Sequence, residues 1–410
     1  MDTTDLSQLT ASPGAFEELF GEQLAAILDI RSWHHGEDPV EMLETVAAGV
    51  AAAVEAEARL LNPIRAQVFP HLATRPDAPP GAGVYRATVD DLRGIYEGLL
   101  FTGAVEACDA TSFTHETLSL SFTQIGVGLV TYQGNQDTWV QRIFRRDLHE
   151  SLGDPAEEAL ALLEKRSRQD DEEAHRQADL SQLARQAITA YATRAFLLHH
   201  STATWRVGRG NPAPFELLTG AAGSLDIMIE ATKLLEELIC GHRKFLYVPP
   251  EVSTRLLRVI AGAMQPLEYA IVGTLRDTIE PIIESSRDYY DHRLPTASDT
   301  TIDGRRLTPR EWIRRFVDQV ASQVVVGLYR ASELTPAHMF FAHVDHAHEA
   351  ALIALADGLL QPHRGTPMLL DLAKQVCDVT FGPESLAAAL QLGYTRAGAP
   401  LQYLSGRHPH

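Results

Sequence analysis

A stretch of strand-like sequence in the first third of the chain constrains the fold more than any other feature. Leu118 to Tyr132 is rich in Leu, Ile, Val, Phe and Thr, and the turn-like Gln133 to Asp137 connects it to a second run, Trp139 to Leu148. Such residues favour strands, and a short polar connection between two runs favours a hairpin. The preceding segment, Val105 to Ser112, indicates another strand, which ends on Asp109 and small residues. The sequence therefore predicts three antiparallel strands with a carboxylate on the first.

Strand-like and helical patterns alternate in the rest of the chain, which predicts an α/β fold with a mixed sheet, parallel members and flanking helices. Residues 1–75 are expected to be an N-terminal helical extension that docks or frames the core, with helices at Ala15 to Ile30 and Val40 to Leu61. Residues 84–404 are expected to form that core, with helical insertions at 155–200 and a polar excursion at 287–310.

Further elements of the core are predicted from apolar runs and periodicity. Strands are expected at Lys244 to Val248, Tyr269 to Gly273, Val324 to Tyr329 and Met339 to Val344. Helices are expected at Ser224 to Cys240, Val252 to Met264, His348 to Leu360 and Met368 to Cys377. Glycine, proline and polar residues predict irregular structure at Trp205 to Gly223 and at Tyr394 to His410.

Composition indicates a globular, soluble and cytoplasmic protein. The chain has 410 residues, of which 45% are hydrophobic, and no apolar run approaches the length of a membrane span. Its acidic first residues lack the positive region of a signal peptide. Cys108, Cys240 and Cys377 lie far apart in apolar contexts, so we expect buried thiols without a disulfide or a cysteine metal site.

The net charge of -19 argues against a protein that coats nucleic acid over its whole surface, because backbone binding needs clustered Lys and Arg. Contact with DNA is expected to be local. The candidates are an arginine group on the third strand and an aromatic-basic group in the glycine-rich segment, where a ring could stack on a base. They are Arg142, Arg145 and Arg146, and Trp205, Arg206 and Arg209. A third candidate patch consists of Arg305, Arg306, Arg310, Arg314 and Arg315. An ordinary solvated face, or a packed Trp, is the alternative for each.

Metal-assisted hydrolysis of a phosphodiester needs two or three carboxylates that converge on a cation, with a basic group near the phosphate. Asp109 is the first candidate, because small residues follow it and would let substrate approach; a turn residue at the strand end is the alternative. Glu216 in a Pro-rich loop and Glu230 in the helix before the Lys244 strand compete for a second position. The sequence does not choose between them.

The segment His343 to Glu349 is the densest cluster of metal-competent side chains. His343 and Asp345 would share a strand face and could bind metal, with His346 beside them; a polar helix start with surface histidines is the alternative. Arg330 ends a predicted strand and could clamp a phosphate, or else form a salt bridge. No phosphate-cradling GxxxxGK[ST] loop is present, so energy for DNA movement would come from a partner.

Three segments carry a family resemblance. Val105 to Ser112, with Asp109-Ala110-Thr111-Ser112, resembles the strand ending in Asp-Gly-Ser that opens the ribonuclease-H-like core of the NurA family of DNA-end-resection nucleases. Val324 to Arg330 is similar to a later family strand that ends on a basic residue, and Arg364 to Cys377 to its closing Gly-x-Pro and helix. The resemblance covers roughly residues 104–404.

This resemblance implies a ribonuclease-H-like core and a nuclease that depends on Mn²⁺ (or Mg²⁺) and cuts single- and double-stranded DNA. It also implies a ring-like homodimer, docked on a HerA-type hexameric ATPase, in DNA end processing or defence against foreign DNA. Asp109 matches the family's first metal ligand, and Glu230 matches its helical Glu.

The chain departs from the family at two positions. Val248-Pro249-Pro250 stands where the family has a second Asp-Gly, and Lys374 stands where its last helix often carries His. Glu216 and the His343 to His346 cluster could replace the lost groups. Otherwise the protein would be a catalytically weak adaptor on the ATPase ring. A hydrolase of small phosphoesters that uses His343, Asp345 and His346 is a third possibility.

Overall fold

The computed structural model describes residues 16–17, 23–33, 39–116, 121–134, 136–145, 185–220, 225–294, 301–302 and 305–400. The chain divides into two compact units, residues 1–62 and 63–410. The first contains α2 (Leu24–Leu28), η2 (Ile30–Ser32) and most of α3 (Pro39–Pro63), which confirms the helix expected at Val40 to Leu61. No helix of the described residues combines the length and the apolar character that a bilayer crossing requires.

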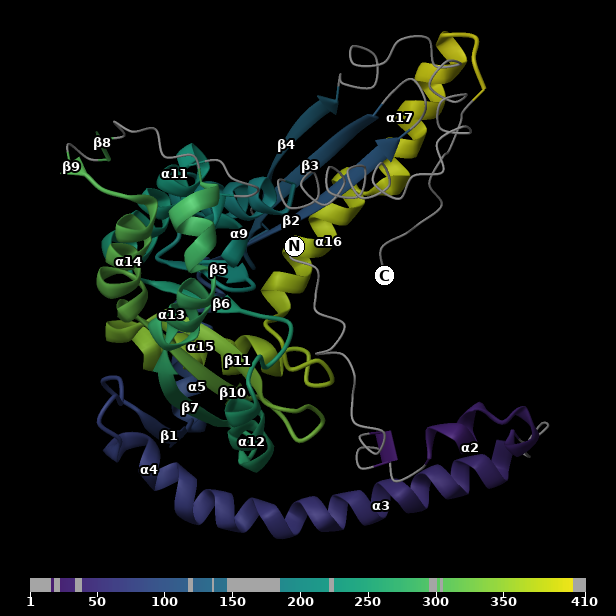
Figure 1. The fold of residues 1–410 in the computed structure, drawn as a ribbon, viewed down its shortest axis with the longest axis vertical. Coiled ribbons are helices and arrows are strands. Elements are labelled where there is room, and N and C mark those ends of the chain that lie inside the picture. The colour runs from purple at the N-terminus through teal and green to yellow at the C-terminus, as the bar shows by residue number, and fades with distance from the viewer. Residues whose placement is uncertain are drawn as a thin grey trace. The chain divides into compact units, whose positions relative to one another are not determined.

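Nine strands of the second unit form one mixed sheet in the order β1-β7-β10-β11-β6-β5-β2-β3-β4 (Figure 1). β2, β3 and β4 are antiparallel neighbours, and β5 and β6 continue the sheet parallel to β2. This arrangement confirms the predicted ribonuclease-H-like mixed sheet. The strands are β1 (Gly83–Arg86), β2 (Val105–Glu116), β3 (Ser121–Val130), β4 (Gln136–Arg145), β5 (Trp205–Arg209), β6 (Phe245–Val248), β7 (Glu268–Thr274), β10 (Val324–Arg330) and β11 (His338–His343).

The first strand is longer than the sequence predicts. We expected it to end at Asp109, but β2 continues to Glu116 and pairs with β3 along its length, with Asp109 opposite Gly128 and Ser112 opposite Ile125. The hydroxyl residues after Asp109 include β-branched threonines, which favour a strand as readily as they fit a site. Asp109 therefore lies inside a strand, and the pairing with β3 continues before and after it.

Two layers of helices cover the sheet. Along β6, Phe245 and Tyr247 belong to one apolar core, whereas Leu246 and Val248 belong to the other, as alternation along a strand requires. The first core includes side chains of α11 (Leu225–Glu236), η5 (Glu237–His242), α12 (Arg255–Ala263), α13 (Leu275–Ser285) and α14 (Pro309–Gln319). The second includes side chains of α5 (Val89–Ile95), η4 (Tyr96–Leu100), α15 (Ala347–Leu359) and α16 (Met368–Phe381).

The remaining elements are short or peripheral. They are η3 (Ile64–Val68), α4 (Phe69–Thr74), α9 (Phe215–Leu218), η6 (Tyr289–Arg293), β8 (Thr301–Ile302), β9 (Arg305–Arg306), η7 (Ala321–Gln323), η8 (Val344–His346), α17 (Pro383–Arg396) and a helix over residues 185–199. α16 lies along β2 and β3, and α17 continues beside them (Figure 1). Of the helical insertion expected at 155–200, residues 155–184 lie outside the described part.

The sequence misses two strands of the sheet, β1 and β5. Trp205 to Gly223 was expected to be a loop because of its glycines, but Gly208 is required inside the sheet. A Cβ atom at Gly208 would lie 2.3 Å from the Tyr247 ring on β6, so only glycine admits that ring. The segment after Tyr394 was also expected to be irregular, whereas α17 extends to Arg396.

Candidate functional site

The parallel pairing of β2 and β5 builds the centre of the candidate site. Cys108 lies opposite Gly208, so the next residues, Asp109 and Arg209, are neighbours at the same level of the sheet. Both belong to the face that α16 covers, because Ala107 and Val207, two residues earlier, are part of that core. The Nε atom of Arg209 donates to Oδ2 of Asp109 at 2.7 Å.

A second carboxylate reaches the same guanidinium from α16. Asp371, in the first turn of that helix, accepts from Nη2 of Arg209 at 3.0 Å. One arginine therefore joins two acids that lie in distant parts of the sequence. The Cys377 thiol, further along α16, donates to the carbonyl oxygen of Asp109 at 3.1 Å and fixes the helix against β2.

Burial and ion pairing act in opposite directions on these groups. Burial raises the pKa of Asp109 and outweighs the attraction of Arg209, which lowers it. For Asp371, burial also acts to raise the pKa, but hydrogen bonds from Gln361 and Arg209 outweigh it, so the pKa is lowered. Burial alone would lower the pKa of Arg209, yet the two acids raise it. Arg209 therefore stays charged, and Asp371 is the more strongly held carboxylate.

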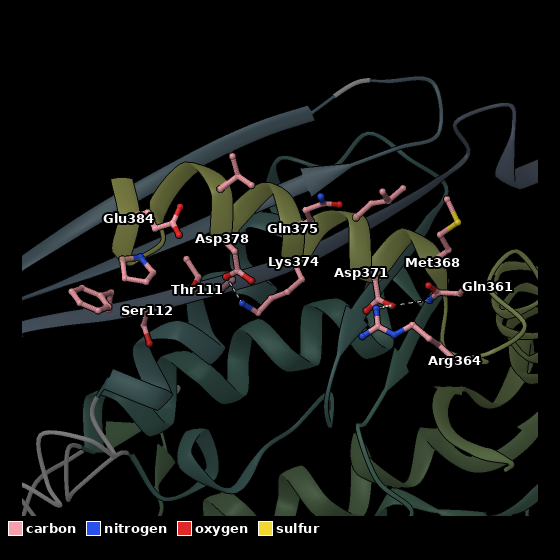
Figure 2. Close-up of a pocket in the computed structure, with 15 residues that line it drawn as sticks. Thr111, Ser112, Gln361, Arg364, Met368, Asp371, Lys374, Gln375, Asp378 and Glu384 are labelled. Atoms are coloured by element: carbon pink, nitrogen blue, oxygen red, sulfur yellow. Dashed lines mark hydrogen bonds and ion pairs between the residues drawn. The ribbon is translucent and has the colours of Figure 1, made fainter. Parts of the chain in front are cut away.

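Beyond Asp109, the edge of β2 and one side of α16 form an open groove of about 1140 Å³. Thr111 and Ser112 contribute small polar side chains, as the sequence predicts, and the opposite wall comes from α16 and the loop before it. Figure 2 shows Arg364 and Gln361 converging on Asp371, and Lys374 pointing at Asp378. The groove thus carries exposed cations beside carboxylates.

The start of α16 is held by a buried acid on α15. Asp357 is 1% exposed and accepts from the backbone nitrogen of Leu369 at 3.1 Å and from the Tyr132 hydroxyl. Burial raises the pKa of Asp357 to about 6. This contact caps the helix that carries Asp371 and Lys374, so Asp357 positions that wall of the groove.

The His343 cluster lies at the other end of the parallel strands. His343 follows the β11 residues that pair with β6, which places it near the start of β6, and the His346 ring is 6.1 Å from that of Trp205 at the start of β5. Trp205 and Arg209 are four residues apart, about 13 Å along a strand. The structure does not bring the expected metal ligands His343 and Asp345, or the expected catalytic His346, to Asp109. Asp345 instead pairs with Arg243 at 3.5 Å.

Neither expected second carboxylate joins Asp109. Glu230 is exposed on α11 and forms an ion pair with Lys233 at 3.1 Å. Glu216 lies on α9, and its charge acts on Arg194, whose guanidinium is 5.2 Å from the centre of the Tyr247 ring. The carboxylate that does reach Asp109 through Arg209 is Asp371. In the sequence it follows Gly365-Thr366-Pro367, the segment that precedes the predicted helix and carries part of the family resemblance.

Arg330 and the predicted DNA-contact residues differ in burial and in their partners. Arg330 donates to the backbone carbonyls of Met264 and Thr335, at 2.7 and 3.1 Å, and so holds loops together. Trp205 is 0% exposed, so its ring offers no face to a base in this structure. Arg206 is half-buried near Glu106, and the exposed Arg142 donates to Gln124 at 2.8 Å. The Arg145 side chain and Arg146 lie outside the described residues.

The donors around Asp109 do not fit a divalent metal as they stand. Each carboxylate oxygen of Asp109 and Asp371 already accepts a hydrogen bond, from Arg209 or from a neighbouring donor. Among the residues that the structure describes, no three His, Cys, Asp or Glu side chains form a metal-binding group. Lys374 adds a positive charge that acts on Asp109.

Comparison with solved structures finds NurA nucleases. The NurA nuclease from Sulfolobus solfataricus has 9% identity and a TM-score of 0.42, over 87% of this chain and 98% of that one. A structure of NurA with manganese has 11% identity and a TM-score of 0.27, over 74% and 96%. A third NurA structure has 9% identity and a TM-score of 0.35, over 75% and 96%. No family model and no curated protein matches the chain.

Proposed function

We propose that this chain is a NurA-like deoxyribonuclease whose reaction centre is the groove beside Asp109. The observation that carries the proposal is the convergence of Asp109 and Asp371 on Arg209 in a mixed sheet of ribonuclease-H-like order. The opening-strand resemblance at Val105 to Ser112 supports the same function. The solved NurA proteins are nucleases, and the strand that resembles theirs is the one that carries Asp109 here.

The groove has the chemistry to hold a DNA backbone. Arg364 and Lys374 expose cationic ends at its wall, and each could shift from its carboxylate partner to a phosphate. Thr111 and Ser112 offer hydroxyl groups on the facing strand. An acidic chain that binds DNA only in such a local groove agrees with the net charge of -19.

The expected partners remain part of the proposal. The chain has no phosphate-cradling loop of its own, which supports a separate motor such as a HerA-type hexameric ATPase that feeds DNA to the groove. A homodimer, and a role in DNA end processing or defence, follow from the same resemblance. Mn²⁺ or Mg²⁺ is the expected cofactor, but no step is assigned to it, because the donors at Asp109 do not fit a metal as arranged.

Cleavage assays on variants of the full chain test the proposal. The wild type should degrade linear double-stranded and single-stranded DNA in Mn²⁺ or Mg²⁺, with or without the ATPase, and Asp109→Asn should abolish this while keeping the wild-type fold by circular dichroism. Glu280→Gln, an exposed acid on α13 that pairs with Arg276, is the matched control. Wild-type cleavage by the Asp109→Asn protein would exclude this reaction centre.

A catalytically weak adaptor is the second candidate, and Arg209 favours it. A guanidinium that already neutralises both acids is what a site without metal chemistry would retain. An adaptor would stimulate the partner ATPase, and Asp109→Asn would leave that stimulation unchanged. Absence of DNA cleavage by the wild type, together with intact ATPase stimulation, would select this function.

A further inference from the structure

The guanidinium of Arg209 occupies the space between the two carboxylates of the groove. Its Nε atom is 2.7 Å from Asp109 and its Nη2 atom is 3.0 Å from Asp371, so two nitrogen atoms of one planar cation serve two acids. Bridging two carboxylates in this way is also what a divalent ion does in a metal-dependent hydrolase. The position that such an ion would take is therefore filled by a side chain of the protein itself.

Each oxygen of the two acids already accepts at least one hydrogen bond. The second oxygen of Asp109 accepts from the backbone nitrogen of Ala110 at 2.8 Å. The second oxygen of Asp371 accepts from Gln361 at 2.7 Å and from Arg364 at 3.0 Å. A metal ion would have to displace several of these donors at once.

The charges of the cluster also balance without a metal. Two carboxylates face two guanidinium groups, Arg209 and Arg364, and the Lys374 ammonium, which also acts on Asp109, is itself paired with Asp378. Adding a doubly charged cation would leave an excess of positive charge in a partly buried site, where repulsion is weakly screened. Arg209 keeps 32% of its side chain exposed, so it has a path by which it could leave the acids.

We propose that Arg209 acts as a built-in cation that replaces a divalent metal between Asp109 and Asp371 and keeps metal out. The inference deepens the proposed function, because it concerns the same site and states the condition under which that site could take a metal. In the absence of DNA the wild-type chain then binds no Mn²⁺ at Asp109, because Arg209 is in place, and removal of the guanidinium creates a site that does.

Titration with Mn²⁺ tests this directly, without DNA. Free Mn²⁺ is followed by electron paramagnetic resonance in the full-length wild type and in Arg209→Gln, Arg209→Gln/Asp109→Asn and Arg206→Gln. The last is the matched control, since it removes a half-buried arginine from the same strand. Arg209→Gln should bind one Mn²⁺ at least about tenfold more tightly than the wild type, given the repulsion that is removed. The double variant should lose the gain, and Arg206→Gln should match the wild type.

Two results would overturn the inference. One is equal Mn²⁺ affinity of the wild type and Arg209→Gln; the other is stoichiometric binding by the wild type that Asp109→Asn removes. The second comparison needs no Arg209 variant, so it decides the matter even if Arg209→Gln does not fold. Weak binding that is the same in the wild type and Asp109→Asn supports the inference. DNA cleavage that does not depend on Asp109 would defeat the proposed function and leave these titrations unaffected.

Discussion

Two buried arginine-carboxylate contacts in the second unit differ in a way that separates a structural clamp from a site. Arg65 on η3 gives both Nη atoms to the two oxygens of Glu268, each at 2.8 Å. Arg209 divides its donors between Asp109 and Asp371. A bidentate pair satisfies one acid completely, whereas a shared guanidinium gives each acid a single bond.

The pKa values of the acids follow this difference. For Glu268, burial acts to raise the pKa, but the hydrogen bond from Arg65 and one from the Gln265 backbone outweigh it, so the pKa is lowered. For Asp109, burial outweighs Arg209 and the pKa is raised. Glu268 is thus stabilised as a carboxylate, whereas burial disfavours the charged form of Asp109. The comparison indicates that Arg65 is fixed and that Arg209 is the exchangeable partner.

Replacement of Arg209 by Ala should have the largest effect on stability. It leaves Asp109, which is 7% exposed, without its cation, and we expect the free energy of unfolding to fall by about 3 to 5 kcal/mol in urea titrations near neutral pH. An acid whose pKa is raised by folding, such as Asp109, stabilises the folded state below its unfolded pKa. This contribution to stability is lost as the pH rises through the folded pKa. The defect should therefore shrink on acidification, as Asp109 becomes protonated. A defect that grows on acidification would contradict this explanation.

The sequence predicts β2, β3 and β4 near Asp109, but it does not predict the contact between Asp109 and Arg209. β2, β3 and β4 were predicted because alternation and a short turn are local signals, and Asp109 stood out by its small neighbours. Arg209 was predicted to contact DNA. The sequence around a basic residue in a glycine-rich segment does not show whether its side chain faces solvent or pairs with a buried acid. Its pairing with Asp109 depends on the parallel register of β5, a strand that the glycines concealed.

Asp371 could not be predicted as a member of the site for a related reason. It lies 162 residues from Arg209, in the first turn of α16, where an acid is also ordinary because it interacts well with the helix dipole. Glu216 and the His343 cluster were preferred on their local sequence context, and Glu230 on the family resemblance. Which carboxylate reaches Asp109 is decided by how α16 packs on β2, a tertiary contact that one sequence does not encode in any short pattern.

Asp357 extends the comparison to a buried acid whose hydrogen-bond donors, Tyr132 and the Leu369 nitrogen, are uncharged. Its folded pKa of about 6 lies above that of an unfolded Asp. Its contribution to stability is full below the unfolded value and is lost as pH rises through about 6. We expect the wild type to lose about 3 kcal/mol relative to Asp357→Asn between roughly pH 4 and pH 7. Parallel pH profiles of the two proteins would contradict the shift.

Glu268→Gln tests the Arg65–Glu268 pair. The effect of this substitution on stability should depend on pH in the opposite direction to that of Asp357→Asn. The variant keeps one acceptor for Arg65 but loses the charge, and because Arg65 is 30% exposed we expect a loss of only about 2 kcal/mol near neutral pH. The lowered pKa of Glu268 makes its contribution full above the unfolded value and lost as pH falls through the folded one. The difference from wild type should therefore vanish in acid. A difference that instead vanishes in base would show that folding raises the pKa of Glu268, as it raises the pKa of Asp357.

Gln361→Ala should have the smallest effect, because it removes an uncharged donor and leaves both cations on Asp371. The Gln361 amide is 2.7 Å from Oδ2 of Asp371, whose other oxygen keeps Arg209. We expect a loss of about 1 kcal/mol and a rise in the pKa of Asp371, measured by NMR titration of its carboxyl carbon. The pKa of Asp109 should stay unchanged, since Gln361 does not contribute to it. A shift in both acids would show that Arg209 moves when Gln361 is lost, and that the two carboxylates respond as one unit.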